Sequence, residues 1–261
     1  MKLNKSLKIG ITGSKGFIGG NIAAALENKN IRLFFFDLPK NDLLKLGKSL
    51  ENFVKNKDVI IHAAAINRGT DAEVIAGNVV ATYNLISMIE KYLPAEVKAK
   101  AGKNHTKLIY LSSIQAETDT LYGKSKWLAE IMLEDFSNTT KIPVSIFRLT
   151  NVFGEGCKPF YNSVVATFCY QAANNKELKV NRESRSKKIN LIYIGDVVEI
   201  IIKEIFARRK NQFYFKIIDS KNEISVGDLA DLIKSFKNNK FKAKNKFYKD
   251  LYKTYLSYVR K

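Results

Sequence analysis

The 261-residue chain has little cysteine, little proline and no long run of apolar residues. Its only thiols are Cys157 and Cys169, which lack the spacing of a metal site and fit a protein of the reducing cytoplasm. No apolar stretch approaches the length that a membrane span needs, and the basic first residues do not lead into a signal-peptide core. We therefore expect a cytoplasmic protein with no metal site and no membrane partner.

Acidic residues are also scarce. The chain has 25 of them against 44 lysines and arginines, which gives a formal net charge of +19. Such a charge is typical of nucleic-acid-binding proteins, but here lysine far outnumbers arginine and aromatic residues are not interleaved with the cations to form a base-stacking surface. We expect a solvated lysine surface, no nucleic-acid partner, and a positive field that favours anionic small molecules.

Glycine is infrequent, yet three glycines follow one another at intervals of three, directly after the apolar run 7–12. Apolar residues then recur at helical spacing, so the glycines lie in a turn between a strand and a helix. There Gly13 permits the turn, Gly16 admits a pyrophosphate, and Gly19 allows the helix to pack on the strand. We assign to nucleotide binding the residues Gly13, Lys15, Gly16, Phe17, Ile18 and Gly19.

A second predicted strand, residues 31–37, ends in Asp37, roughly 20 residues after the glycine turn, where dinucleotide-binding folds place the carboxylate that binds the ribose. This carboxylate would accept hydrogen bonds from the ribose of NAD and repel the additional phosphate of NADP. Lys40 supplies a cation that would offset the repulsion. The sequence pattern alone leaves the choice of cofactor open.

Strand and helix patterns alternate along the first 150 residues. Predicted strands at 58–65, 107–113 and 143–149 are separated by predicted helices at 71–92 and 122–136. This predicts an α/β fold, a Rossmann-type doubly wound parallel sheet, over residues 1–150. Residues 151–261 are expected to form a small C-terminal substrate-binding lobe. Its predicted elements are a helix at 163–173, a strand, turn and helix at 189–206 capped by Asp196, and a last helix with one aromatic face.

The segment "YGKSK" places Tyr122 and Lys126 four residues apart at the start of a predicted helix. Their side chains can therefore share one face of the helix. Among the twelve tyrosines only Tyr122 has a lysine at this spacing. A neighbouring cation is expected to lower the pKa of the phenol and to suit it to proton transfer.

In this order, the glycine turn, Asp37, "DVIIHAAA", Asn78, "LSS" and "YGKSK" resemble the extended short-chain dehydrogenases, a family of nucleotide-sugar epimerases, dehydratases and reductases. The resemblance implies that Ser113 joins Tyr122 and Lys126 as a catalytic residue, with Ser112 as the alternative, and that His62 is a strand residue. It further implies cofactor contacts by Asp58, near the adenine, by Ala63, Ala64 and Ala65, and by Asn78 and Lys126.

Longer stretches, including "AAINRG" and "SSIQAETDTLYGKSK", resemble the reductase domains of bifunctional capsular-polysaccharide enzymes. The resemblance implies reduction of the 4-keto group of a UDP-2-acetamido-2,6-dideoxy-hexos-4-ulose, in the formation of UDP-N-acetyl-L-fucosamine for capsule or O-antigen. NADP(H) is the expected cofactor, with NAD(H) also accepted. These enzymes continue into a cupin domain that epimerises C3. This sequence includes no cupin domain, so we expect that step to need a separate cupin-type partner, and we expect a homodimer.

Polar residues outside the catalytic set are candidates for contacts with the sugar and the diphosphate, because cations and amides suit phosphate and hydroxyl groups. Surface roles are equally open for several of them. They are Arg68, Asn151, Lys158, Asn162, Ser163 and Arg185. Two alternatives also stay open: a nucleotide-sugar 4-epimerase or dehydratase that retains its NAD, and a non-catalytic sensor or binding protein with this fold. A reductase consumes reduced cofactor, whereas an epimerase shows no net consumption.

Overall fold

The computed structural model describes residues 6–27, 30–92, 106–209, 211–237 and 241–259. It divides into two compact units, the first comprising residues 1–149 and 200–217 and the second residues 150–199 and 218–261. The chain thus returns to the first unit after residue 199. The expected division has a single boundary at residue 150 and does not include this return.

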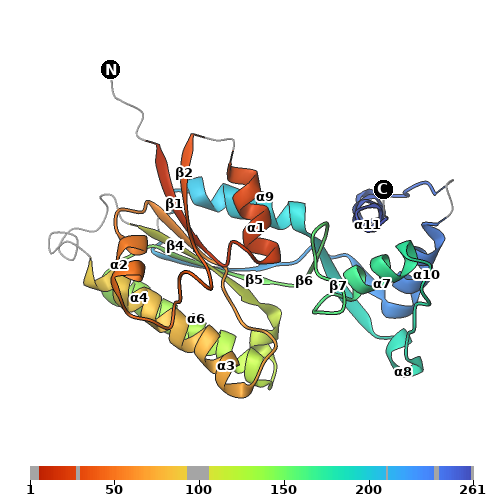
Figure 1. The fold of residues 1–261 in the computed structure, drawn as a ribbon, viewed down its shortest axis with the longest axis horizontal. Coiled ribbons are helices and arrows are strands. Elements are labelled where there is room, and N and C mark those ends of the chain that lie inside the picture. The colour runs from red at the N-terminus through yellow and green to blue at the C-terminus, as the bar shows by residue number, and fades with distance from the viewer. Residues whose placement is uncertain (1–5, 28–29, 93–105, 210, 238–240, 260–261) are drawn as a thin grey trace. The chain divides into compact units, whose positions relative to one another are not determined.

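A six-stranded sheet forms the centre of the first unit (Figure 1). Its strands are β1 (Leu7–Thr12), β2 (Ile31–Phe36), β3 (Val59–His62), β4 (Lys107–Ser113), β5 (Val144–Leu149) and β8 (Phe213–Ile218). Their order is β2-β1-β3-β4-β5-β8, and the pairs from β2 to β5 are parallel. The order reverses between β1 and β3, and in open parallel sheets ligands bind at the carboxyl ends of the strands beside such a reversal.

Helices cover both faces of this sheet, as in a doubly wound fold (Figure 1). Helix α1 (Phe17–Leu26) lies on one face, together with the end of α9 (Ile194–Phe206). The other face carries α2 (Lys48–Val54), α3 (Asp71–Ile75), α4 (Ala81–Lys91) and α6 (Leu121–Thr140). Leu50, Leu85 and Leu133 of these helices are completely buried in one apolar core with residues of β3 and β4. The predicted Rossmann-type fold is confirmed.

Residues 71–91 form one helical run in which the π-helix η1 (Ala76–Val80) joins α3 to α4. The run has 21 residues, and its most apolar window of 18 residues has a mean hydropathy of 1.3. By length and composition it could cross a membrane, contrary to our expectation that no stretch reaches that size. Half of its most apolar window is buried within the protein. Buried core helices have the same composition, because one face packs against the sheet.

The second unit holds a three-stranded sheet of β6 (Asn151–Phe153), β7 (Lys188–Tyr193) and β9 (Glu223–Ser225), in the order β6-β7-β9. Its helices are α7 (Val164–Ala173), α8 (Arg182–Arg185), α10 (Val226–Ser235) and α11 (Lys246–Leu256). The predicted turn between the strand and the helix of residues 189–206 is wrong, because β7 passes directly into α9. Asp196 consequently lies in the first turn of α9 and does not cap it.

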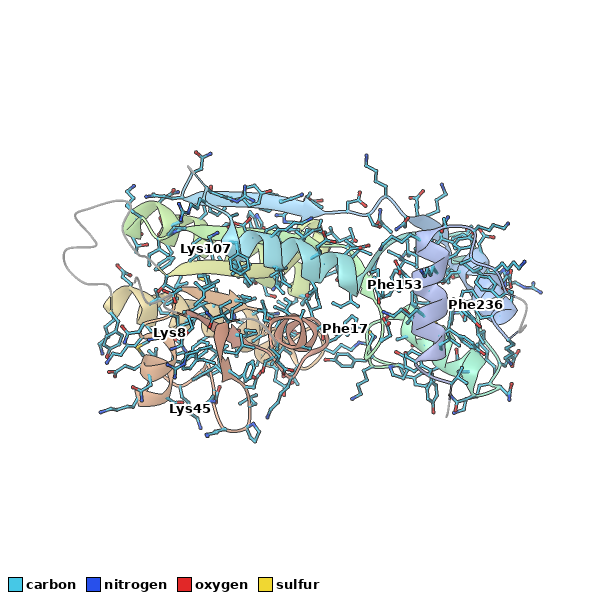
Figure 2. All side chains as sticks on the ribbon, turned by 90° about the horizontal axis from the view of Figure 1, so that it is seen from above. Lys8, Phe17, Lys45, Lys107, Phe153 and Phe236 are labelled. Atoms are coloured by element: carbon cyan, nitrogen blue, oxygen red, sulfur yellow. The ribbon has the colours of Figure 1, made fainter. Side chains whose placement is uncertain are left out.

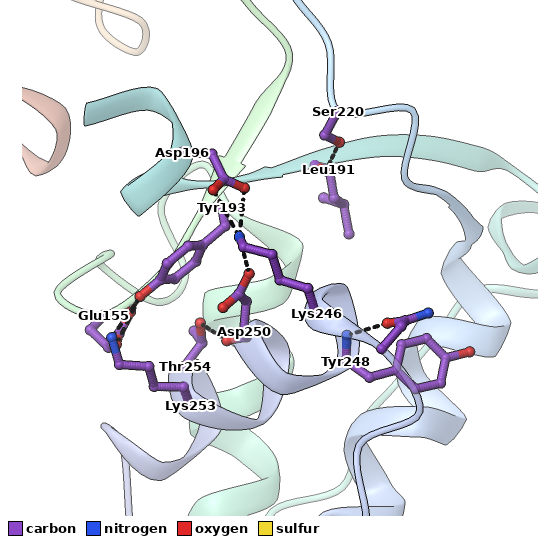
Figure 3. A network of polar contacts seen from close by, with 11 residues as sticks. Glu155, Leu191, Tyr193, Asp196, Ser220, Lys246, Tyr248, Asp250, Lys253 and Thr254 are labelled. Carbon is purple, nitrogen blue, oxygen red and sulfur yellow. Dashed lines mark hydrogen bonds and ion pairs between the residues drawn. The ribbon is translucent and has the colours of Figure 1, made fainter. Parts of the chain in front are cut away.

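The predicted aromatic face of the last helix packs within its own unit. In α11, Leu251 is completely buried, and Tyr252 and Tyr255 contact the ring of Phe236. Polar contacts fix the opposite side (Figure 3): Lys253 Nζ lies 2.8 Å from the Tyr193 hydroxyl and 2.8 Å from Glu155 Oε1. Lys246 of the same helix donates to Asp196 and Asp250.

Candidate active site

The glycine turn after β1 is built so closely that side chains could not be accommodated. Gly13 has a φ of +74°, and an added Cβ would lie 2.6 Å from the backbone nitrogen of Ala64. A Cβ on Gly19 would lie 2.2 Å from the carbonyl oxygen of Gly13. Helix α1 begins here without a side-chain cap and without an acidic residue in its first turn. Its first backbone N–H groups therefore suit a bound anion, as a pyrophosphate-binding turn requires.

Asp37 lies beside this turn, as predicted. Its carboxylate accepts a hydrogen bond from the hydroxyl of Ser14 at 2.5 Å and a longer one from the backbone N–H of Lys15 at 3.4 Å. The Lys15 ammonium in turn donates to the carbonyl of Leu38 at 2.8 Å. Lys40 is exposed two residues further on. A carboxylate and two lysines thus lie close to where the adenosine ribose of a dinucleotide would bind.

A buried polar chain supports the ends of β1 and β3. His62 lies between the hydroxyls of Thr12, at 2.7 Å, and Thr82, at 3.0 Å. Burial lowers the pKa of His62 to about 3, and the nearby charge of Lys126 adds to this, so the imidazole is neutral at physiological pH. His62 is therefore a strand residue, in agreement with the sequence analysis. The segment Ala63–Ala65 follows at the carboxyl end of β3, where a cofactor would lie.

Asn78 is buried in the π-helix and joins two parts of the site. Its side-chain oxygen accepts from the backbone N–H of Ile66 at 2.8 Å, and its amide donates to the Ile66 carbonyl at 2.7 Å and to the Ser125 hydroxyl at 3.0 Å. Ser125 donates to the carbonyl of Tyr122. Asn78 thus ties the loop after β3 to the first turn of α6, and it is not a solvent-facing residue.

Asp58 does not belong to this site. It precedes β3, and its carboxylate accepts from the backbone N–H of Lys8 near the start of β1 at 2.7 Å. Lys8 and Lys107 lie at one end of the sheet, whereas Phe17, which follows the glycine turn, lies at the other (Figure 2). Because the strands are parallel, their amino ends share one edge and their carboxyl ends the other. The predicted contact of Asp58 with the adenine is therefore wrong.

Ser113 and Tyr122 face each other across the turn between β4 and α6. Ser113 is the last residue of β4 and caps the short helix η2 (Ile114–Glu117) by accepting from the backbone N–H of Gln115. Burial raises the pKa of the Tyr122 phenol, and the nearby Ser113 side chain opposes that shift. Our expectation of a lowered pKa is therefore wrong, because desolvation outweighs any neighbouring cation. At neutral pH Tyr122 is a protonated phenol.

Lys126 is buried, with 1% of its surface exposed. Among the described residues, its ammonium has one hydrogen-bond acceptor, the Leu111 carbonyl at 2.9 Å, and it lies 4.1 Å from the centre of the Tyr110 ring. Burial lowers its pKa to about 7. An ammonium has three N–H donors, so two donors of this buried group are available to a ligand.

The second serine of "LSS" has a different role. Ser112 is buried and donates to the carboxylate of Glu130, which also binds Arg148. The side chain that meets Tyr122 is therefore that of Ser113. Glu130 and Arg148 are not among the residues that the sequence predicts for the site. The one available signal was the helical spacing of Tyr122, Lys126 and Glu130, which lie at successive intervals of four.

The predicted substrate-binding residues belong to both units. Arg68 is exposed in the loop before α3 in the first unit. In the second unit, Lys158 and Asn162 are exposed in the loop before α7, and Ser163 is the N-cap of α7. Asn151 donates to the carbonyl of Asn190. Arg185 is engaged within its own unit, because it forms an ion pair with Asp231 of α10 at 2.9 Å.

The second unit has a groove of about 360 Å³, which the sequence does not predict. Apolar side chains of Val164, Phe168 and Ile189 form part of its lining. The remaining lining includes two lysines and two small polar side chains, namely Lys179, Asn181, Ser184 and Lys187. An apolar surface beside cations suits a nucleotide, whose base is flat and whose phosphates are anionic.

Known proteins resemble the chain along almost its whole length. It is 33% identical over 260 residues to a Pseudomonas aeruginosa UDP-2-acetamido-2,6-beta-L-arabino-hexul-4-ose reductase, covering 97% of this chain and 65% of that protein. It is 25% identical to a putative UDP-glucose 4-epimerase from Methanocaldococcus jannaschii, with 86% and 80% covered. The chain thus spans slightly less than two thirds of the reductase that it matches.

Solved structures share the fold. The capsular polysaccharide assembling protein CapF from Staphylococcus aureus superimposes with a TM-score of 0.75 and 31% identity, over 97% of this chain and 65% of that one. The UDP-glucose 4-epimerase from Thermotoga maritima superimposes with a TM-score of 0.80 at 18% identity, over 97% and 98%, and indicates the fold alone. A family model matches residues 9–214. The chain therefore belongs to the NAD-dependent epimerase/dehydratase family, whose members use a nicotinamide cofactor.

Proposed function

We propose that this protein is an NADPH-dependent reductase of the 4-keto group of a UDP-2-acetamido-2,6-dideoxy-hexos-4-ulose. The observation that carries the proposal is the juxtaposition of Ser113, a protonated Tyr122 and the buried Lys126 at the carboxyl end of β4. The similarity to a curated reductase with such a substrate supports the choice of sugar. The protein would act in the cytoplasm, in nucleotide-sugar formation for capsule or O-antigen.

The site's residues suit the reduction of a ketone. Ser113 and Tyr122 would donate hydrogen bonds to the keto oxygen and stabilise the negative charge that develops on it. A bound nicotinamide would supply the hydride. Tyr122, a neutral phenol because of its burial, would protonate the resulting alkoxide. Lys126 would bind the nicotinamide ribose with its free N–H donors and favour the transfer of the phenolic proton.

The glycine turn and the residues around Asp37 would hold the other end of the cofactor. The uncapped start of α1 would bind the pyrophosphate. Lys15, whose ammonium lies against the Leu38 carbonyl, and the exposed Lys40 would attract the phosphate of NADPH. Because Asp37 repels that phosphate, the preference for NADPH should be modest and NADH should also be used.

For the substrate, we propose that the groove of the second unit binds the uridine diphosphate. Lys179 and Lys187 would bind its phosphates. The exposed loop residues Lys158 and Asn162 would contact the sugar. Reduction would be the activity of the residues described here, and C3 epimerisation would need a cupin-type partner.

We also propose a homodimer. Exposed apolar side chains lie on α6, at Leu121, Trp127, Leu128 and Ile131, and on the neighbouring helical run, at Ile75, Val80 and Tyr83. Such a patch on adjacent helices is typical of an interface between protein chains. Light scattering of the purified chain should give twice the monomer mass, and Trp127→Lys should give the monomer mass.

The function is tested by following NADPH oxidation with a panel of UDP-4-keto sugars. The expected result is one NADPH consumed for each sugar reduced. Substrates with dTDP in place of UDP test whether the enzyme recognises the nucleotide base. Interconversion of two sugars without net NADPH consumption would instead identify a 4-epimerase. Absence of both reactions, with tight cofactor binding, would support a sensor or binding protein.

A further inference from the structure

A buried ionic cluster includes Glu130, one helical turn after Lys126 on α6, and the proposed mechanism does not use it. The carboxylate of Glu130, whose exposed fraction is 6%, accepts from Arg148 through Nε at 2.9 Å and through Nη2 at 2.6 Å. The Ser112 hydroxyl donates to the same carboxylate. Such complete use of a buried carboxylate fixes its position.

The strand β4 aligns this carboxylate with Lys126. The Lys126 ammonium donates to the carbonyl of Leu111, and the Glu130 carboxylate accepts from the side chain of the next residue, Ser112. Lys126 and Glu130 are one turn apart on α6, so their side chains project from the same face of that helix. Strand and helix therefore both place the carboxylate on the same side of α6 as the ammonium, and its charge acts on Lys126.

We propose that Glu130 is a positioning residue of the active site: its buried carboxylate, held by Ser112 and Arg148, keeps the Lys126 side chain protonated and directed at the ligand. Removing water from around an ammonium favours the neutral amine, and a nearby carboxylate opposes this. The Lys126 ammonium is subject to both effects: burial lowers its pKa, the charge of Glu130 opposes this, and the resulting pKa is about 7.

The other titratable groups around Lys126 do not supply a buried negative charge. On α6, Tyr122 is a neutral phenol, and on β4 Tyr110 is a phenol whose pKa burial raises further. On β3, His62 is neutral above a pH of about 3. On β5, Arg148 is a cation, and its second partner is the exposed Glu117 of η2. Among these groups Glu130 is the one buried anion.

The proposal is tested first without any ligand. Protein labelled with ¹³C at the lysine ε-carbon is titrated by NMR between pH 5 and 10, and the Lys126 signal is identified by its loss in Lys126→Met. We expect Glu130→Gln to lower the Lys126 midpoint by about one pH unit or more. Glu204→Gln is the matched control, because Glu204 is equally buried and pairs with an arginine and a serine far from Lys126. It should leave the midpoint within about 0.3 units.

An unchanged midpoint in Glu130→Gln, or an equal shift in Glu204→Gln, would overturn the proposal. If Glu130→Gln does not fold, the double variant Glu130→Gln/Arg148→Met removes both charges together, which buried pairs tolerate better than the loss of one partner. The midpoint should again fall, and a midpoint at or above the wild-type value would overturn the proposal.

A second measurement rests on the proposed function. In Glu130→Gln the alkaline limb of the pH profile of kcat/KM for keto-sugar reduction should move to lower pH by the same amount as the NMR midpoint. Glu204→Gln should keep the wild-type profile. A changed NMR midpoint with an unchanged pH profile would refute the proposed link between Glu130 and catalysis. Loss of NADPH oxidation in the wild type itself would refute the proposed function and leave the NMR result standing.

Discussion

The two ends of strands β4 and β5 carry the same set of residue types with different consequences. At the amino ends, Glu204 binds Arg209, Ser145 and Lys107. At the carboxyl ends, Glu130 binds Arg148 and Ser112, with Lys126 beside it. Figure 2 shows Lys107 at the end of the sheet that lies away from Phe17 and the glycine turn. Each end thus buries a glutamate with an arginine, a serine and a lysine.

The lysines differ in how completely they are bound. Lys107 donates to the carbonyls of Glu204 and Ala207, both at 2.7 Å, and to the Glu204 carboxylate at 3.3 Å. Lys126 has a single carbonyl acceptor among the described residues. A fully bound ammonium stabilises the structure, whereas an incompletely bound one costs stability and remains available to a ligand. The difference distinguishes a structural ionic cluster from a catalytic one.

The largest expected effect is that of removing the proton donor. Tyr122→Phe should lower the rate of keto-sugar reduction by at least ~100-fold, the usual contribution of a general acid. Cofactor affinity should stay close to that of the wild type, because the phenol contacts the sugar. Steady-state kinetics and calorimetric NADPH binding measure the two quantities. Tyr248→Phe, a partly exposed tyrosine on α11, is the control. A turnover by Tyr122→Phe close to that of this control would contradict the assignment.

The next experiment replaces each of the two lysines by methionine and compares the effects on activity and on stability. Lys126→Met should abolish most of the activity and weaken cofactor binding, but the free energy of unfolding should not fall, because an incompletely bound buried cation is replaced by an apolar chain of similar length. Lys107→Met should keep the activity and lower the free energy of unfolding by roughly 1–3 kcal/mol through lost hydrogen bonds. Urea denaturation and NADPH oxidation, measured on both variants, separate the two cases. A destabilised Lys126→Met would remove the distinction between the clusters.

The comparison also shows what sequence could and could not predict. The glycine turn, the strand ending in Asp37, and Tyr122 with Lys126 could be located because each depends on local spacing along the chain. The Glu130 cluster could not, because Ser112, Glu130 and Arg148 meet only when β4, α6 and β5 pack together. In β4 and β5 the pairing places Ser112 opposite Arg148, a register that the sequence alone does not fix.

Two predictions from the sequence, the pKa of Tyr122 and the cofactor contact of Asp58, are wrong for physical reasons. The pKa of Tyr122 is raised because burial outweighs a charge, and burial is a property of the folded chain that helical spacing does not report. Asp58 was placed near the cofactor by resemblance, yet a strand has two ends and only its carboxyl end meets the ligand in a parallel sheet. The substrate contacts after residue 150 stay predictions, since exposed lysines and asparagines lack a distinguishing pattern.

The pH dependence of stability sharpens the contrast further. The pKa of Lys126 is about 7 in the folded protein and ~10.4 in an unfolded chain. Between these pH values the unfolded state holds a proton that the folded state has released, so this lysine makes the free energy of unfolding rise with pH. Below pH 7 and above the unfolded pKa its contribution is constant. Urea unfolding of the wild type and of Lys126→Met from pH 7 to 10 should give a smaller rise in the variant. Equal slopes would show that Lys126 is charged throughout this range.

The smallest expected effect concerns the exposed partner of the catalytic-end cluster. Glu117 pairs with Arg148 at 2.7 Å, but 64% of its side chain is exposed. Glu117→Gln should therefore lower the free energy of unfolding by less than ~1 kcal/mol, because solvent screens an exposed pair. The pH profile of catalysis should not move, since Arg148 keeps its bonds to Glu130. Urea unfolding at low and at high salt measures the first quantity, and the small loss should shrink as the salt concentration rises. A shift of the pH profile comparable to that of Glu130→Gln would mean that the whole cluster, and not the buried carboxylate, sets the charge of Lys126.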